Sequence, residues 1–225
     1  MTKQRNGSVI IPIFGMNCCQ GSLDLRYYRA VLASPDPLLA WADESHAIMI
    51  PDRNIYLFGA VVLPESDVEN ARAVAATLLR SSEQKAHWRK RTNQRRDEMI
   101  SVLNELPITP VVAIRFSSTS EREERQRRKC LEQFIPLLVN FGVSDLILES
   151  RGSREDKLDR DMFSAMQSQG QIPGSEIRLD HMTGPGDPLL WLADALCGAA
   201  LADRRGESRW WRGLTRDAIV METNA

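Results

Sequence analysis

Leu-Leu-Ala-Trp-Ala-Asp-Glu-Ser, at residues 38–45, is a short apolar run that ends in two acids. A second run, Asn-Ile-Tyr-Leu-Phe-Gly-Ala-Val-Val-Leu at residues 54–63, is rich in β-branched and aromatic residues. The turn-forming pair Pro51-Asp52 lies between them. Apolar runs bounded by such breakers predict strands, and the short connection predicts an antiparallel hairpin. We expect this hairpin to begin the fold.

Asp43 lies inside the first of these strands. Side chains alternate across a strand, so Asp43 shares a face with Leu39 and Trp41, whereas Glu44 lies on the opposite face. A carboxylate in an apolar strand is costly unless a cation or hydrogen-bond donors hold it. Asp43 is therefore the first candidate site residue, and the alternative is that it caps a turn at the strand end.

Beyond the hairpin, helices and strands alternate along the chain. Helical spacing of apolar residues predicts helices over 66–80, up to about 106, and over 121–141, 155–168 and 187–203. Short apolar runs predict strands over 110–116, 144–150 and 176–182. This order predicts an α/β fold, a mixed sheet flanked by helices, in a single domain. The expected domain spans residues 38–205, with an irregular N-terminal extension at 1–37 and a C-terminal tail at 206–225.

Composition excludes several classes of protein. The hydrophobic fraction of 43% and the charged fraction of 26% are close to globular averages, which excludes a disordered or fibrous chain. The formal net charge of -1 argues against coating of nucleic acid through bulk positive charge. No apolar run approaches the roughly 18 residues that span a bilayer, and the four cysteines lack CxxC spacing. We expect a cytoplasmic protein with reduced thiols and no membrane association.

Two further acids occur in apolar surroundings. Glu149 follows three apolar residues at a strand end, and its alternative role is an ion pair with Arg151 or Arg154. Asp194 lies inside an apolar helix, on the face expected to pack against the sheet. Its alternative role is a buried hydrogen bond. Asp187 opens the same helix two turns earlier and nearly on the same face, although an N-cap before a proline explains it equally well.

Carboxylates from separate elements suit a site for hard divalent cations. Ligands of open α/β sheets gather at the carboxyl ends of the strands, and Mg²⁺ and Mn²⁺ prefer oxygen ligands. Two such ions about 4 Å apart stabilise the attacking and leaving oxygens of a phosphoryl displacement. We therefore expect Asp43, Glu149 and Asp194 to bind Mg²⁺ or Mn²⁺, with Asp187 as an assisting catalytic acid.

The same motifs resemble an uncharacterised prokaryotic family, the domain of unknown function 3800 family (DUF3800), which is similar to the RNase H-like superfamily. That family begins with an Asp-Glu-Ser-Gly strand and closes with a Leu-Ala-Asp helix. The matching segments are Trp41–Ser45, Leu57–Val62, Lys85 and Asp187–Asp194. The resemblance runs from about residue 38 to 203 and implies an RNase H-like fold. It also implies a metal site formed by a first-strand acid, a later strand-end acid and an acid of the closing helix, here Asp43, Glu149 and Asp194.

This chain departs from the family pattern at one position. His46 follows Asp-Glu-Ser where the family has glycine, so it either blocks the loop or adds a polar group to the site. Asp180 ends another strand and is the alternative to Glu149 as the strand-end acid.

A strongly basic stretch, Lys-Ala-His-Trp-Arg-Lys-Arg-Thr-Asn-Gln-Arg-Arg, runs over residues 85–96. On a functional interpretation Lys85 contacts phosphate beside the acids as a catalytic group, and Trp88 stacks on a base. The full candidate set for nucleic-acid binding is Lys85, His87, Trp88, Arg89, Lys90 and Arg91. The alternative is the solvated start of a helix.

The leading hypothesis is a metal-dependent nuclease that hydrolyses phosphodiester bonds of DNA or RNA at these carboxylates. One alternative is a non-catalytic RNase H-like binding or accessory protein in a mobile-element or phage-defence context. Another is a metal-dependent phosphatase with a narrow pocket. Trp210-Trp211 is a candidate contact for a homodimer or a protein partner, with packing onto the domain as the alternative.

Overall fold

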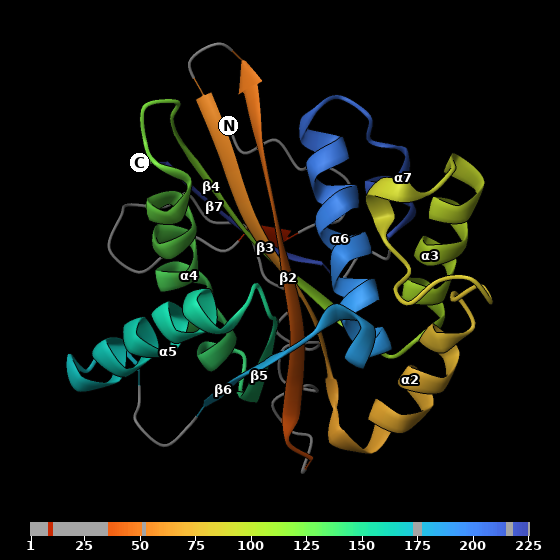
Figure 1. Cartoon of the computed structure of the whole chain (residues 1–225), viewed down its shortest axis with the longest axis horizontal. Helices are drawn as coiled ribbons and strands as arrows, with labels where there is room; N and C mark the ends of the chain where they lie inside the picture. The colour runs from red at the N-terminus through yellow and green to blue at the C-terminus, as the bar shows by residue number, and fades with distance from the viewer. Residues whose placement is uncertain (1–8, 11–35, 51–52, 173–176, 215–217, 225) are drawn as a thin grey trace.

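The computed structural model describes residues 9–10, 36–50, 53–172, 177–214 and 218–224 (Figure 1). The strands are β1 (Val9–Ile10), β2 (Leu38–Ile50), β3 (Arg53–Pro64), β4 (Thr109–Ser118), β5 (Val143–Glu149), β6 (Arg178–Met182) and β7 (Ile219–Asn224). The helices are α2 (Val68–Ala76), α3 (Asn93–Glu105), α4 (Glu123–Asn140), α5 (Ser153–Ser168), α6 (Pro188–Arg204) and α7 (Arg209–Gly213). Short 3₁₀ turns are η1 (Glu65–Asp67), η2 (Trp88–Lys90) and η3 (Gly184–Gly186).

The described strands form one mixed sheet in the order β1-β7-β4-β3-β2-β5-β6. β3 pairs antiparallel with β2 and β4, and the other neighbouring strands pair parallel. The expected hairpin is therefore β2–β3, in which Asp43 pairs with Gly59. The predicted mixed sheet flanked by helices is confirmed. The prediction succeeded because two-residue alternation and helical spacing were both strong in these segments.

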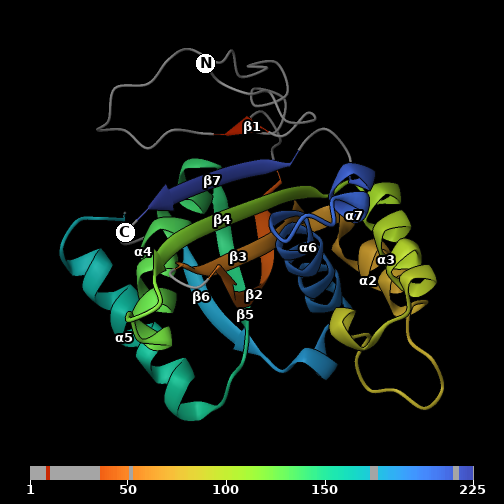
Figure 2. The ribbon, with the colours of Figure 1, turned by 90° about the horizontal axis from the view of Figure 1, so that it is seen from above.

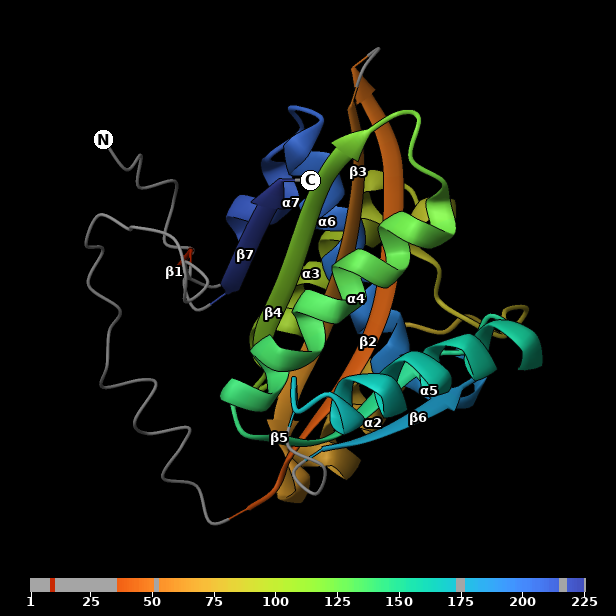
Figure 3. The ribbon, with the colours of Figure 1, turned by 90° about the vertical axis from the view of Figure 1, so that its left-hand side faces the viewer.

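Helices cover both faces of the sheet, as the view from above shows (Figure 2). α6 packs on β2 and β3, with α2, α3 and α7 outside it, and Figure 3 shows α4 and α5 crossing the opposite face. Each face has its own hydrophobic core: Trp41 belongs to the core under α6, whereas Ala40 and Ala42 belong to the core under α4. The alternation predicted for β2 is thus confirmed, and it directs Asp43 toward α6 and Glu44 toward α4.

α6 is apolar nearly all round because it is enclosed on most sides. Asp187 caps its first turn by accepting a hydrogen bond from the Leu189 backbone N–H, and Pro188 occupies the first helical position. A helix that is hydrophobic on nearly every face belongs in a protein interior, so an acid in its middle, Asp194, is unusual. No helix among the described residues has the length and hydropathy to cross a membrane.

The chain ends differ from expectation. Residues 206–225 were expected to form a tail, but they contribute α7 and the strand β7, which pairs parallel with β4. Trp210 is 1% exposed and packs in the core under α6 rather than offering an external docking surface. Of the expected irregular extension, residues 9–10 form β1 beside β7, and apart from 36–37 the rest lies outside the described residues.

Candidate active site

Three acids from three elements meet where β5 ends. Ala42 pairs with Leu148 at the last position of the parallel β2–β5 register, and the residues that follow are Asp43 and Glu149. β2 continues beyond this point into the hairpin, so Asp43 lies mid-strand while Glu149 lies at a strand end. α6 crosses β2 and supplies Asp194 to the same place. The parallel register and the packing of one helix are therefore enough to gather the acids.

The ammonium of Lys85 lies between two of these carboxylates. Its Nζ donates a hydrogen bond to Glu149 Oε2 and lies 3.7 Å from Asp43 Oδ2. Its side chain is only 5% exposed. Burial lowers the pKa of Lys85, but the carboxylates of Asp43, Asp194 and Glu149 outweigh this effect and raise the pKa above its usual value. Lys85 is consequently held as a cation inside the site.

Asp43 experiences an excess of negative charge. Its pKa is raised well above the usual range, first by burial and then by the carboxylates of Asp194 and Glu149. Lys85 and a hydrogen bond of 2.7 Å from the Glu44 backbone N–H to Asp43 Oδ1 oppose this shift without cancelling it. One ammonium therefore does not balance the carboxylates around it, and the site favours further positive charge.

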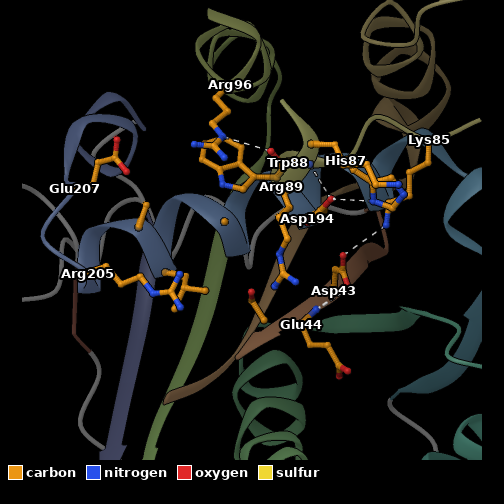
Figure 4. A pocket seen from close by; sticks show the side chains of 15 residues that line it. Asp43, Glu44, Lys85, His87, Trp88, Arg89, Arg96, Asp194, Arg205 and Glu207 are labelled. Atoms are coloured by element: carbon orange, nitrogen blue, oxygen red, sulfur yellow. Dashed lines mark hydrogen bonds and ion pairs between the residues drawn. The ribbon is translucent and has the colours of Figure 1, made fainter. Parts of the chain in front are cut away.

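The loop between α2 and α3 holds Asp194 from the other side. Asp194 Oδ2 accepts a hydrogen bond of 3.0 Å from the Trp88 backbone N–H and lies 3.7 Å from His87 Nδ1. Figure 4 shows Asp43, Lys85, His87 and Asp194 facing one another from the sheet, this loop and α6. The hydrogen bond predicted as the alternative role of Asp194 exists, and it fixes the carboxylate beside Asp43 rather than away from the site.

The Trp88 ring anchors that loop on α6. Gly198 makes this possible, because a Cβ at this position would lie 2.1 Å from Trp88 Cδ1. The ring also packs edge-on against Trp210, with centroids 5.2 Å apart, and lies under the Arg96 guanidinium. Since Trp88 is 6% exposed, the predicted role as a stacking surface for a base is wrong. An isolated glycine in an apolar helix was the sequence signal for this close contact.

The hydrogen-bond partners of Asp187 are not part of the carboxylate cluster. Its Oδ2 accepts hydrogen bonds from Trp41 Nε1 at 2.9 Å and from Arg72 Nε and Nη2 at 3.0 and 2.7 Å. Its Oδ1 accepts from the Leu189 backbone N–H, and the residue is 1% exposed. The N-cap alternative describes Asp187 correctly, and these donors leave it no part in the cluster of Asp43, Glu149 and Asp194.

A pocket of about 450 Å³ opens above the acids. Asp43, Lys85 and Asp194 line one end, and four basic side chains extend along it: Arg89, Lys90, Arg96 and Arg205. Arg96 belongs to the predicted basic stretch, whereas Arg205 was not predicted, because the approach of α6 to the loop cannot be read from spacing. Arg91 was expected here, but it forms a two-pronged ion pair with Glu83, with both N–O distances at 2.7 Å.

The positions of His46 and Asp180 decide two further alternatives that the sequence left open. His46 stacks on Tyr56 at 5.7 Å between centroids and lies 3.5 Å from Glu123, on the face away from Asp43, so it does not block the site. Asp180 is an exposed residue of β6, and it is Glu149 that contacts Lys85.

The carboxylate oxygens of this site are chemically suited to a hard divalent cation. Carboxylate oxygens are what Mg²⁺ and Mn²⁺ prefer, and their mutual repulsion at Asp43 is what a cation relieves. Among the described residues, however, no group of three His, Cys, Asp or Glu side chains stands ready around one ion position. Lys85 accounts for this between Asp43 and Glu149, where its ammonium already lies.

The sheet has one antiparallel strand among otherwise parallel strands, and an acid-bearing helix packs on β2. Among solved structures, the chain is similar to the PCNA:RNase HII complex from Archaeoglobus fulgidus, at 14% identity and a TM-score of 0.44, covering 76% of this chain and 74% of that one. It is also similar to ribonuclease H2 from Pyrococcus horikoshii (13%, 0.43, 75% and 74%). A third is Bst-RNase HIII in complex with Mn²⁺ (8%, 0.41, 85% and 61%).

No protein-family model matches the chain, the DUF3800 family included, and no curated protein matches it. The function therefore has to be argued from the site itself.

Proposed function

We propose that this protein is a metal-dependent nuclease that hydrolyses phosphodiester bonds of nucleic acid. The observation that carries the proposal is the composition of one pocket: excess carboxylate at one end and four basic side chains along the rest. Acids that attract a divalent ion, next to a basic track, suit a substrate that carries one phosphate at the reacting position and others beside it.

Each side chain has a role in this proposal. Asp43, Glu149 and Asp194 would hold Mg²⁺ or Mn²⁺, which when bound supplies positive charge to the phosphate and acidifies a water molecule. Lys85 adds a fixed positive charge beside the reacting phosphate, and Arg89 and Arg96 contact neighbouring phosphates. In the reaction the water oxygen bonds to phosphorus and loses a proton to the site. The bond to the leaving oxygen breaks, and that oxygen gains a proton.

The basic side chains favour a polymeric substrate over a small phosphorylated molecule. Arg89, Lys90 and Arg205 are exposed and line the same pocket as Asp43 and Asp194. A phosphatase acting on a small molecule needs no such row of charges. Because the overall charge is nearly balanced at -1, binding depends on this local row and weakens as salt rises.

The test is cleavage of labelled single-stranded, duplex and hybrid nucleic acids with Mg²⁺, Mn²⁺ or EDTA. We expect metal-dependent cleavage by the wild type and a loss of at least about 100-fold in Asp43→Asn and Asp194→Asn. Asp161→Asn is the matched control, because Asp161 is an exposed acid on α5 that forms an ion pair with Lys157. Binding of nucleic acid without cleavage, unaffected by EDTA, would instead identify a non-catalytic binding protein.

A further inference from the structure

We propose that Lys85 takes the place of one of the two divalent ions of a two-metal site, so that this protein binds a single ion, between Asp43 and Asp194. The inference rests on the proposed metal site and specifies its stoichiometry. It follows from the position of the ammonium, from the way the side chain is held, and from the charge balance.

The ammonium lies where a bridging ion would. Lys85 Nζ contacts Glu149 and lies 3.7 Å from Asp43 Oδ2, so one cation already links the acids of β2 and β5. In two-metal sites the two ions are about 4 Å apart and share a carboxylate. Asp43 is the acid that would be shared here, because Lys85 and Asp194 both lie near its carboxylate.

The surrounding backbone and side chains hold the Lys85 side chain in this position. A Cβ at Gly184 would lie 2.7 Å from Lys85 Cδ and 2.5 Å from Glu149 Oε1, so the backbone of η3 closes directly over the pair. The loop that carries Lys85 is fixed by the Arg91–Glu83 ion pair and by the Trp88 ring on α6. Displacing the ammonium would therefore require movement of these packed elements.

The charge balance of the site favours one bound divalent ion over two. Three carboxylates against one ammonium leave two negative charges, which a single divalent ion neutralises. Two ions would leave the buried site with two positive charges. Asp194 Oδ2 is held by Trp88 and His87, and no ion pair that the structure describes joins it to Lys85, although the charge of Asp194 also acts on that ammonium. The side of Asp43 that faces Asp194 is therefore where added positive charge is favoured.

The experiment is a Mn²⁺ titration by calorimetry, with low-temperature EPR of the loaded protein to distinguish an isolated ion from an exchange-coupled pair. For the wild type we expect one ion per chain and the spectrum of an isolated ion. Lys85→Met keeps the length of the stem but removes the charge, so it should bind two ions with a coupled spectrum. Asp194→Asn should lose the ion. Lys157→Met, a change at an exposed lysine of α5, is the control and should behave as the wild type.

Each outcome decides between the two proposals. Two coupled ions in the wild type, or one ion in a folded Lys85→Met, would refute the substitution by Lys85 and leave the metal-dependent nuclease standing. No bound ion in either protein would refute the metal site and with it the proposed function. Lys85→Gln, which keeps a polar end group for Glu149, is the second neutral variant, and the wild-type stoichiometry decides the question if neither folds.

Discussion

Gly198 on α6 controls how closely the site loop approaches the sheet, and Gly198→Ala tests this directly. The added methyl would lie 2.1 Å from Trp88 Cδ1, about 1.3 Å short of the 3.4 Å of an ordinary contact. The ring cannot retreat inward, because Trp210 packs against its other side and is 1% exposed. The loop must therefore move outward, and the hydrogen bond from the Trp88 backbone to Asp194 is lost.

Overpacking of this kind costs about 1–3 kcal/mol. For a chain of this length each kcal/mol corresponds to roughly 2–4 °C in Tm, so we expect Gly198→Ala to lower Tm by about 2–12 °C in thermal unfolding followed by circular dichroism. Gly213→Ala is the matched control, since its Cβ would meet only Ile100 at 3.4 Å. There the better helix propensity of alanine should stabilise the protein by about 0.5–1 kcal/mol.

A double-mutant cycle with Trp88→Ala isolates the contact. Trp88→Ala alone should cost about 3–5 kcal/mol, but in that background Gly198→Ala has nothing to collide with and should cost little. The coupling between the two changes should therefore equal the overpacking cost, about 1–3 kcal/mol. A neutral Gly198→Ala in the wild type, or costs that simply add, would show that the ring does not lie on Gly198.

Three further predictions concern charged groups. Burial and the neighbouring carboxylates raise the pKa of Asp43, so the stability of the wild type falls as the pH rises from about 4 through that raised pKa. In EDTA, Asp43→Asn should therefore have a higher Tm than the wild type at pH 7. Equal Tm values at pH 7 would refute this. Asp187→Asn should lower the free energy of unfolding by about 1–3 kcal/mol, because an amide cannot accept hydrogen bonds at both of its ends. Mn²⁺ binding measured by calorimetry should stay unchanged, and a loss of binding would show that Asp187 belongs to the metal site. Arg127→Met should cost about 3–5 kcal/mol in urea unfolding, since it removes the arginine that pairs with the buried Asp159 and leaves that carboxylate with its His181 contact. Asp159→Asn should recover part of that cost; failure to recover any would contradict the pairing.

The features predicted correctly from sequence were those that local periodicity governs. Alternation in residues 38–45 gave the faces of Trp41 and Asp43, and the cap and proline at residues 187–188 gave the start of α6. The same reasoning failed for Asp187 as a site residue. A spacing of seven from Asp194 implies one helix face, but an N-cap has extended geometry, here φ -145° and ψ 121°, so its carboxylate does not follow the helical projection.

What could not be predicted depends on contacts between distant segments. β7 forms because Ile219–Asn224 finds β4, more than a hundred residues away, and nothing local distinguishes it from a tail. Arg127 lies in the stretch 121–129, where mixed charges at helical spacing favour a solvated face of ion pairs. It is nevertheless 2% exposed, because α4 lies against Glu44 of β2. The pairing of Lys85 with Glu149 likewise depends on a loop whose path is set by Trp88.

Asp43 and Glu44 are neighbours on β2, but strand alternation sends them into charge clusters of opposite character. Glu44 meets Arg127 at 2.5 Å and Arg151 at 3.7 Å, and Arg127 also pairs with Asp159, so acids and arginines balance on the α4 face. On the α6 face Asp43 shares one ammonium with two other carboxylates, and burial keeps solvent from screening them. A buried cluster with its own counter-charges gains nothing from an added cation, whereas one with excess negative charge does. The two faces thus differ in charge balance rather than in acid content, and that difference is the physical reason to look for metal binding at Asp43 and not at Glu44.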